Sequence, residues 1–191
     1  MTINQYTEPG DVKLSNLRLT SGKGAAARQI SLLGQLATFS IYEDMMSPVM
    51  YAEIELVDAI NIVSNFPIVG GETINIDFQT AGVAVMSTFE FVVNSVDKVI
   101  TDANAQVSSY VIKCVSPEQR ISAKSMMYKS TQGQISVAVK EILEGMQSEI
   151  PNRPKRGIYV QDTTGLMGTV APKLKPFAAI DYFRRNHRQI C

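Results

Sequence analysis

Apolar residues recur at every second position through much of the first half of the chain, and this pattern predicts half-buried β-strands. Most of these residues are β-branched or aromatic, as a pleated surface favours. The four clearest stretches are Tyr51–Val57, Thr73–Gln79, Ser87–Val96 and Val107–Cys114. Because closing a sheet removes edges that would pair with other chains, we expect one mainly antiparallel β-barrel or strongly curved sheet.

Two further strands are expected nearer the N-terminus. Asp11–Leu19 alternates, but its parity breaks after Leu14, which indicates a bulge or a turn near Ser15-Asn16. Leu36–Tyr42 is the second of these strands.

A short helix and a turn are expected between the central strands. Asp58 is a typical N-cap residue, and the pattern after it predicts a short helix over Ala59–Ser64. Gly70-Gly71 then predicts a turn into the next strand.

Beyond residue 115 the apolar spacing changes to that of amphipathic helices. Ser116-Pro117-Glu118-Gln119 predicts a helix start with a capping box, and Thr131–Gln134 repeats the box before a second helix. Gly157–Gln161 predicts a short strand, and Pro176–Arg185 a third helix. The apolar positions of the second helix fall on one face: Ile135, Val139, Ile142, Leu143 and Met146.

These patterns place the chain in the α+β class with mainly β content. We expect a β-barrel domain over residues 1–115 and a helical α+β segment over residues 116–191. The composition, 45% hydrophobic and 19% charged, is typical of a globular protein and too apolar for a disordered one. The N-terminus lacks the regions of a signal peptide, and no apolar stretch approaches the roughly 18 residues of a membrane span.

Charge is distributed unevenly along the chain. The 18 cations and 18 carboxylates cancel, which argues against general attraction to nucleic acids or anionic lipids. Residues 1–150 carry 10 cations against 16 carboxylates, and residues 151–191 carry 8 against 2. No lysine or arginine lies between Arg28 and Lys98, although nine carboxylates do. This stretch is either a solvated acidic face or a field of one sign that repels an anionic polymer or docks a basic partner.

Candidate residues for catalysis or metal binding are few. His187 is the only histidine, so a site with two histidine ligands cannot form within the chain. Cys114 ends an apolar strand, which favours a buried structural thiol, and a terminal Cys191 makes a Cys–His dyad unfavourable. Glu43 and Asp44 are adjacent and would point to opposite faces of a strand. The sequence therefore predicts no catalytic, cofactor or metal residues, and no enzyme.

An ordered set of motifs carries a family resemblance. Ile41–Asp44 ends one strand, a return strand closes on Asp58, a short helix follows, and Pro67–Glu72 turns into another strand. Pro176–Arg185 adds a helix that begins Pro-Phe-Ala-Ala-Ile. The set covers about residues 11–185 and resembles the N-terminal portion of the baseplate central hub family of contractile-tailed bacteriophages.

The resemblance implies a structural role in a virion. Members of the family form homotrimers of tail-tube-like barrels, which join the tail tube protein to the central spike protein in the baseplate. DNA passes through the channel without specific binding, and the protein is made in the host bacterial cytoplasm. No cofactor and no membrane insertion are implied. A family protomer contributes two barrels, whereas this chain has strands for one. We therefore expect either a fragment or truncated version of a hub, such as its N-terminal portion, or a hub whose second barrel comes from another polypeptide.

Two other functions stay open. One is a tail-tube or injection-system tube protein of the same barrel class. The other is a hydrolase domain associated with the spike, which the lack of converging acid–base groups disfavours. A tube subunit closes sixfold rings, whereas a hub closes threefold ones.

Two sets of residues are expected to act in the hub interpretation. Glu53 and Glu55 share the polar face of one strand and are candidates for lining the channel, where carboxylates would keep DNA from binding. Phe177, Ile180 and Phe183 recur at helical spacing near the end of the chain. Because little of the chain follows them, we expect their helix to be partly exposed in a monomer and covered by an assembly interface.

Overall fold

The computed structural model describes residues 11–22, 27–58, 62, 66, 68–102, 107–150, 157–165 and 167–187. The chain divides into two compact units, Met1–Ser116 (unit 1) and Pro117–Cys191 (unit 2). Unit 1 contains a short 3₁₀ helix, η2 (Leu33–Gln35), and seven strands: β1 (Val12–Ser21), β2 (Arg28–Ser31), β3 (Leu36–Tyr42), β4 (Tyr51–Asp58), β5 (Thr73–Thr80), β6 (Ser87–Asp102) and β7 (Val107–Val115).

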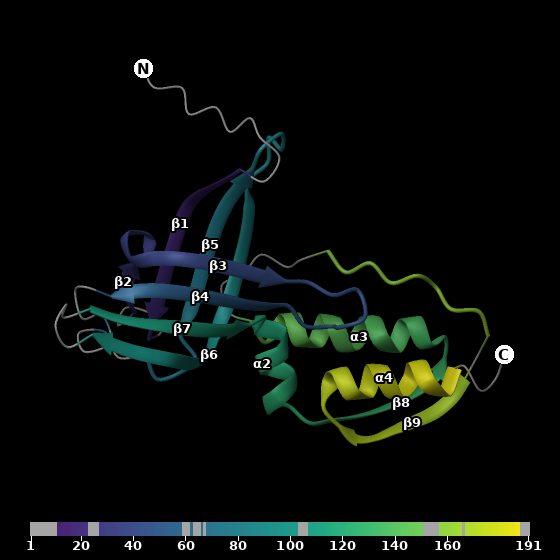
Figure 1. Cartoon of the computed structure of the whole chain (residues 1–191). Helices are drawn as coiled ribbons and strands as arrows, with labels where there is room; N and C mark the ends of the chain where they lie inside the picture. The colour runs from purple at the N-terminus through teal and green to yellow at the C-terminus, as the bar shows by residue number, and fades with distance from the viewer. Residues whose placement is uncertain are drawn as a thin grey trace. The chain divides into compact units, whose positions relative to one another are not determined.

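The seven strands form one antiparallel sheet in the order β2-β1-β5-β6-β7-β4-β3 (Figure 1). The sheet curls strongly, because the rings of Phe39 on β3 and Phe78 on β5 lie 5.7 Å apart although three strands separate them in the ladder order. No ladder joins the outer strands β2 and β3 within the described ranges. The predicted antiparallel, strongly curved sheet is confirmed, but it is an open half-barrel and a closed barrel is not shown.

The long strand β6 makes the corner of the curl. Its first half pairs with β5 up to Val92, and the rest pairs with β7 from Val92 onward. The register shifts between Val93 and Ser95, where an extra residue bends the strand. A second bulge lies in β1 between Leu14 and Asn16, as the break in sequence parity predicts.

Alternation sorts the side chains of the sheet as expected. On β4, Ala52, Ile54 and Leu56 are buried, whereas Glu53 and Glu55 lie on the opposite face. Fully burying a side chain of this size contributes about 1.5–3 kcal/mol. The core of unit 1 consists of residues that face the inside of the curl: Leu17, Leu19, Leu32, Ala52, Ile54, Leu56, Ile62, Phe66, Ile74, Ile76, Phe91, Val93, Tyr110, Ile112 and Cys114.

Two carboxylates of the acidic stretch are structural. Asp58 is buried, and its carboxylate accepts a hydrogen bond from the backbone N–H of Ile62 at 2.6 Å. Ile62 is helical, but most of the predicted helix over 59–64 lies outside the described residues. Glu72, also buried, accepts hydrogen bonds from the N–H groups of Val69 and Gly70. It thereby holds the predicted turn, in which Gly70 has a φ of 99°.

Unit 2 is a two-stranded sheet covered on one face by helices. Its elements are α2 (Pro117–Lys124), β8 (Met127–Gly133), α3 (Ile135–Ser148), β9 (Met167–Leu174) and α4 (Pro176–His187). Strands β8 and β9 are antiparallel, and α3 and α4 pack on each other and on the same face of the strand pair (Figure 1). The core of unit 2 joins these elements through Ile135, Ala138, Ile142, Met146, Ala171, Ala179 and Phe183.

Several sequence predictions for this unit are wrong. Thr131 lies within β8, and the N-cap residue Gln134 makes no side-chain cap hydrogen bond, so no capping box precedes α3. The hydroxyl of Ser116 is buried without a hydrogen-bond partner and caps nothing. The segment 157–161 is not a strand. The true strands β8 and β9 were not predicted because polar residues dominate β8, while Gly168 and Pro172 interrupt β9.

Helix α4, which was expected to be partly exposed in a monomer, packs into the core of unit 2. Phe183 and Ala179 are 0% exposed, and Phe177 and Ile180 are partly buried against the same core. The packing partners precede α4 in the sequence, on α3 and β9. An assembly-interface role for Phe177, Ile180 and Phe183 stays a prediction.

We predict that Phe183→Ala destabilises unit 2 by about 3–5 kcal/mol, because it leaves a cavity in a packed core. Urea unfolding followed by the helical circular dichroism signal would measure the loss. The control Arg184→Ala changes an exposed residue paired with Asp181 on the same helix and should cost about 1 kcal/mol or less. Equal losses in the two variants would contradict the observed packing of α4.

Candidate functional site

The outer face of β3, β4, β6 and β7 carries a polar hollow that contains both predicted channel residues. Its volume is about 180 Å³. The strand register explains why these residues meet: Ser40 lies opposite Glu53, and Lys113 flanks Glu53 on the other side. The hollow is lined by Thr38, Ser40, Glu53, Glu55, Asp97, Val111 and Lys113.

Hydrogen bonds from β3 orient both carboxylates. The Thr38 hydroxyl donates to Glu55 Oε2 at 3.4 Å, and the Tyr42 hydroxyl donates to Glu53 Oε2 at 3.3 Å. Both bonds are long and at the surface, so they restrain the carboxylates only weakly. The alternation of β4, with Ala52, Ile54 and Leu56 buried, is what places both charges on the outer face of the sheet.

Lys113 places a cation in the hollow. Its Nζ lies 2.7 Å from Asp97 Oδ2, and both side chains are well exposed. The hydrogen bond and the charge of Asp97 raise the pKa of Lys113 above its ordinary value, and Glu53 adds to this effect. The hollow thus holds three carboxylates and one ammonium group, so its formal charge is negative.

Sequence reasoning missed Lys113. The stretch without cations is continuous in sequence, but β7 follows it and pairs with β4, so Lys113 comes directly beside Glu53. Arg18 on the exposed face of β1, hydrogen-bonded to Gln29, is a second cation on the sheet surface. Pairing the predicted strands would have revealed both residues. The outer face is therefore acidic but not free of cations.

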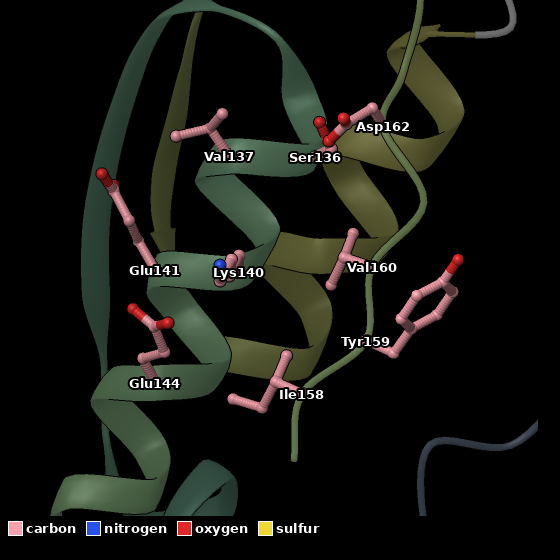
Figure 2. A pocket seen from close by; sticks show the side chains of 9 residues that line it. All are labelled: Ser136, Val137, Lys140, Glu141, Glu144, Ile158, Tyr159, Val160 and Asp162. Atoms are coloured by element: carbon pink, nitrogen blue, oxygen red, sulfur yellow. The ribbon is translucent and has the colours of Figure 1, made fainter.

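A second hollow lies within unit 2, between α3 and the extended segment 157–162 (Figure 2). Ser136 and Thr163 tie this segment to the helix, because each donates its backbone N–H to the hydroxyl of the other, at 3.2 and 3.3 Å. The Tyr159 side chain points away from the hollow and is 95% exposed. Both the backbone N–H and the hydroxyl of Ser136 thus take part in the contact that holds this segment on the helix.

The remaining candidate chemistry does not converge on a site. Cys114 is 2% exposed, and burial raises the pKa of its thiol to about 12, so the predicted structural thiol is confirmed. His187 is the last residue of α4, and Cys191 lies outside the described residues. Across the part of the chain that the structure describes, no group of three or more His, Cys, Asp or Glu side chains could hold a metal ion. No described helix is long and apolar enough to cross a membrane.

Comparison with known proteins identifies the kind of fold. No protein-family model and no curated protein matches the sequence. The crystal structure of a tail protein from Neisseria meningitidis MC58 matches 90% of this chain with a TM-score of 0.50 and 10% identity. This chain has a fold similar to that of a tail protein.

A further match is the E. coli c3393 protein, described as a type VI secretion component similar in structure to the T4 bacteriophage tail proteins gp27 and gp5. It matches 89% of this chain with a TM-score of 0.39 and 9% identity. The chain spans 45% of the Neisseria protein and 38% of the E. coli protein, less than half of each.

We predict that the Cys114 thiol makes the chain less stable in alkali. A pKa raised from 9.0 to about 12 means that the folded state keeps a proton that the unfolded state releases. The free energy of unfolding should therefore fall between pH 9 and 12, by up to about 1.4 kcal/mol per pH unit from this group. Denaturant unfolding of Cys191→Ser with and without Cys114→Ala would isolate this contribution. Identical pH slopes would contradict it.

Proposed function

We propose that this chain is a structural subunit of a phage-tail-like assembly, and that within it the chain acts as a baseplate hub or the N-terminal portion of one. The supporting observation is the curled antiparallel sheet followed by a small α+β unit, an arrangement that matches a tail protein over 90% of this chain. In this role the chain would be a virion tail component, made in the host bacterial cytoplasm, with tail tube and central spike proteins as partners.

A structural role agrees with the chemistry of the surface. The carboxylates of the outer hollow are spread along a sheet face beside Lys113, and the only thiol described is buried. Polar residues in this arrangement can generate an electrostatic field at the surface or contact another protein. They do not supply a nucleophile with an adjacent base. We therefore propose that the chain is not an enzyme, which disfavours a spike-associated hydrolase.

The choice between hub and tube rests on symmetry. The ordered motifs resemble the hub family, whose trimers carry two barrels in each protomer. The chain covers 45% of the Neisseria tail protein, a share that fits one portion of a two-part protomer. A tube subunit of the same fold would close a sixfold ring by itself, whereas a hub would close a threefold one.

Averaging of tail particles that contain the affinity-tagged full chain tests this proposal. We expect density for the tag at one end of the tail, with threefold symmetry. Sixfold density repeated along the tail would favour the tube alternative. Two results together would contradict any structural role: normal particles assembled in the absence of the chain, and no tag in particles made in the presence of the tagged chain.

Within the proposed hub, Glu53 and Glu55 are candidates for lining the DNA channel. Both lie on the outer face of the curled sheet, and Asp97 adds a third carboxylate beside them. A negative wall repels phosphates and avoids the counterion release that favours binding. Lys113 reduces this field but stays engaged with Asp97, so its charge is largely compensated.

We predict that Glu53→Lys with Glu55→Lys leaves assembly intact but slows DNA release from particles roughly tenfold, because lysines in the wall bind phosphates. Real-time fluorescence of released DNA would measure the rate. The matched control is Glu144→Lys with Asp162→Lys, which reverses two exposed charges of unit 2. Normal release from particles shown to contain the Glu53 and Glu55 variant would contradict the channel role.

A further inference from the structure

The two units carry opposite charge. Unit 1 contains 6 lysines and arginines against 12 carboxylates, and unit 2 contains 12 against 6. The chain as a whole is neutral, so the separation is invisible in the overall composition. Two copies of such a chain attract each other most strongly when unit 1 of one faces unit 2 of the other.

The β3–β4 turn presents two exposed methionines. Met45 is fully exposed and Met46 is 81% exposed. The turn has a defined shape, because Asp44 Oδ1 accepts the backbone N–H of Met46 at 2.8 Å and the Asp44 carbonyl accepts the N–H of Ser47 at 3.1 Å. Large apolar side chains held outward in this way are typical of a contact surface.

Aromatic and acidic residues extend this surface to the base of the turn. Tyr42 and Tyr51 are cross-strand partners and are 52% and 45% exposed. Glu43 is exposed beside them, and no lysine or arginine lies between positions 28 and 98. We call Tyr42–Met46 together with Tyr51 the hairpin end; it is apolar and acidic.

The outer face of the β8–β9 sheet is a matching surface in unit 2. Helices α3 and α4 cover the inner face, where Ala171 is fully buried. On the other face, Tyr128 is 71% exposed and Val170 is 64% exposed, and nothing in the described part of unit 2 covers them. Met126, just before β8, is also more than half exposed.

This face lies in a part of the sequence that has cations and no carboxylates. There is no Asp or Glu in residues 119–140 or in residues 163–180. Lys124, Lys173 and Lys175 are exposed, whereas Lys129 pairs with Glu141 of α3. We call Tyr128, Val170 and these three exposed lysines, with Met126, the basic sheet face; it is apolar and basic.

We propose that the hairpin end of one copy docks on the basic sheet face of a second copy of this chain. The two surfaces complement each other in charge, and each has apolar side chains that burial would stabilise. Tyrosine and methionine are common at the centres of protein interfaces, and methionine adapts to the surface it meets. Because the two surfaces differ, the contact is heterologous and links copies head to tail into a ring or an open chain. The inference rests on the proposed function for the presence of several copies in one assembly.

Sedimentation velocity of the purified full chain over a range of concentrations tests the contact. We expect reversible self-association that weakens with added salt. Met45→Ser with Met46→Ser, and separately Tyr128→Ser with Val170→Ser, should each raise the dissociation constant at least about tenfold. The matched control is Val85→Ser with Met86→Ser, which removes the exposed apolar side chains of the β5–β6 turn and should change nothing.

Charge exchange tests the complementarity. Glu43→Lys alone and Lys173→Glu alone should each weaken self-association, and the two changes in one chain should restore it, since the reversed charges again oppose each other. Asp44 is left unchanged because its carboxylate holds the turn. A photo-crosslinking residue at position 46, in a mixture of isotopically labelled and unlabelled chains, should link to the β8–β9 sheet of the other copy.

Other results overturn the inference. These are cross-links confined to one chain, cross-links from hairpin to hairpin, and cross-links in assembled particles to a different protein. The inference would also be overturned if the variants of either surface had the same dissociation constant for self-association as the original chain. That result would not affect the proposed function. A chain that stays monomeric at every concentration would contradict this contact. The proposed function would then still be tested separately by the symmetry of the tail particles.

Discussion

Unit 1 depends on the contact of phenylalanine rings across the inside of its curled sheet. Phe39, Phe78, Phe89 and Phe91 form a continuous series of rings, each 5.7–6.1 Å from the next. The series joins the outer strand β3 to β5 and β6, and it holds the curl where the described residues form no ladder between β2 and β3. Aromatic pairs of this kind contribute about 0.5–1.5 kcal/mol beyond the area they bury.

The curl of the sheet determines which carboxylates between Arg28 and Lys98 face the core and which face outward. Side chains alternate along a strand, so those that face the interior must be buried and hydrogen-bonded, while those that face outward remain solvated. Asp58 ends β4 on the inner side and binds a backbone N–H, whereas Glu53 and Glu55 on the same strand line an outer hollow. The count of carboxylates between Arg28 and Lys98 therefore combines two kinds of group. Some, such as Asp58, hold the fold, and others, such as Glu53 and Glu55, make the outer surface negative.

Six of the seven strands of unit 1 could be predicted from the sequence because each carries its own alternation, and even the β1 bulge is visible as a break in parity. The four-residue strand β2 was not predicted, because it is too short to show a period. Unit 2 could be predicted only in its helices. Its strands have weak local signals. They are stabilised by long-range packing against the helices, which buries Ala171 fully and Leu174 partly. The same limit applies to the outer hollow: Glu53 and Glu55 follow from the β4 pattern, but Lys113 comes beside them only through β4–β7 pairing.

Strand β4 carries two different surfaces, and their chemistry separates what each can do. Its middle, with Glu53 and Glu55, is charged, and Val111 is the apolar residue that lines the hollow there, so burial there would cost desolvation. Its first residue, Tyr51, pairs with Tyr42 at the base of the turn that carries the two exposed methionines, and burial of these side chains would remove apolar area from water. A protein partner is therefore best accommodated at the hairpin end. The middle of the strand is better suited to face water or a repelled polyanion, so one strand can contribute to a contact between subunits and to an open charged surface.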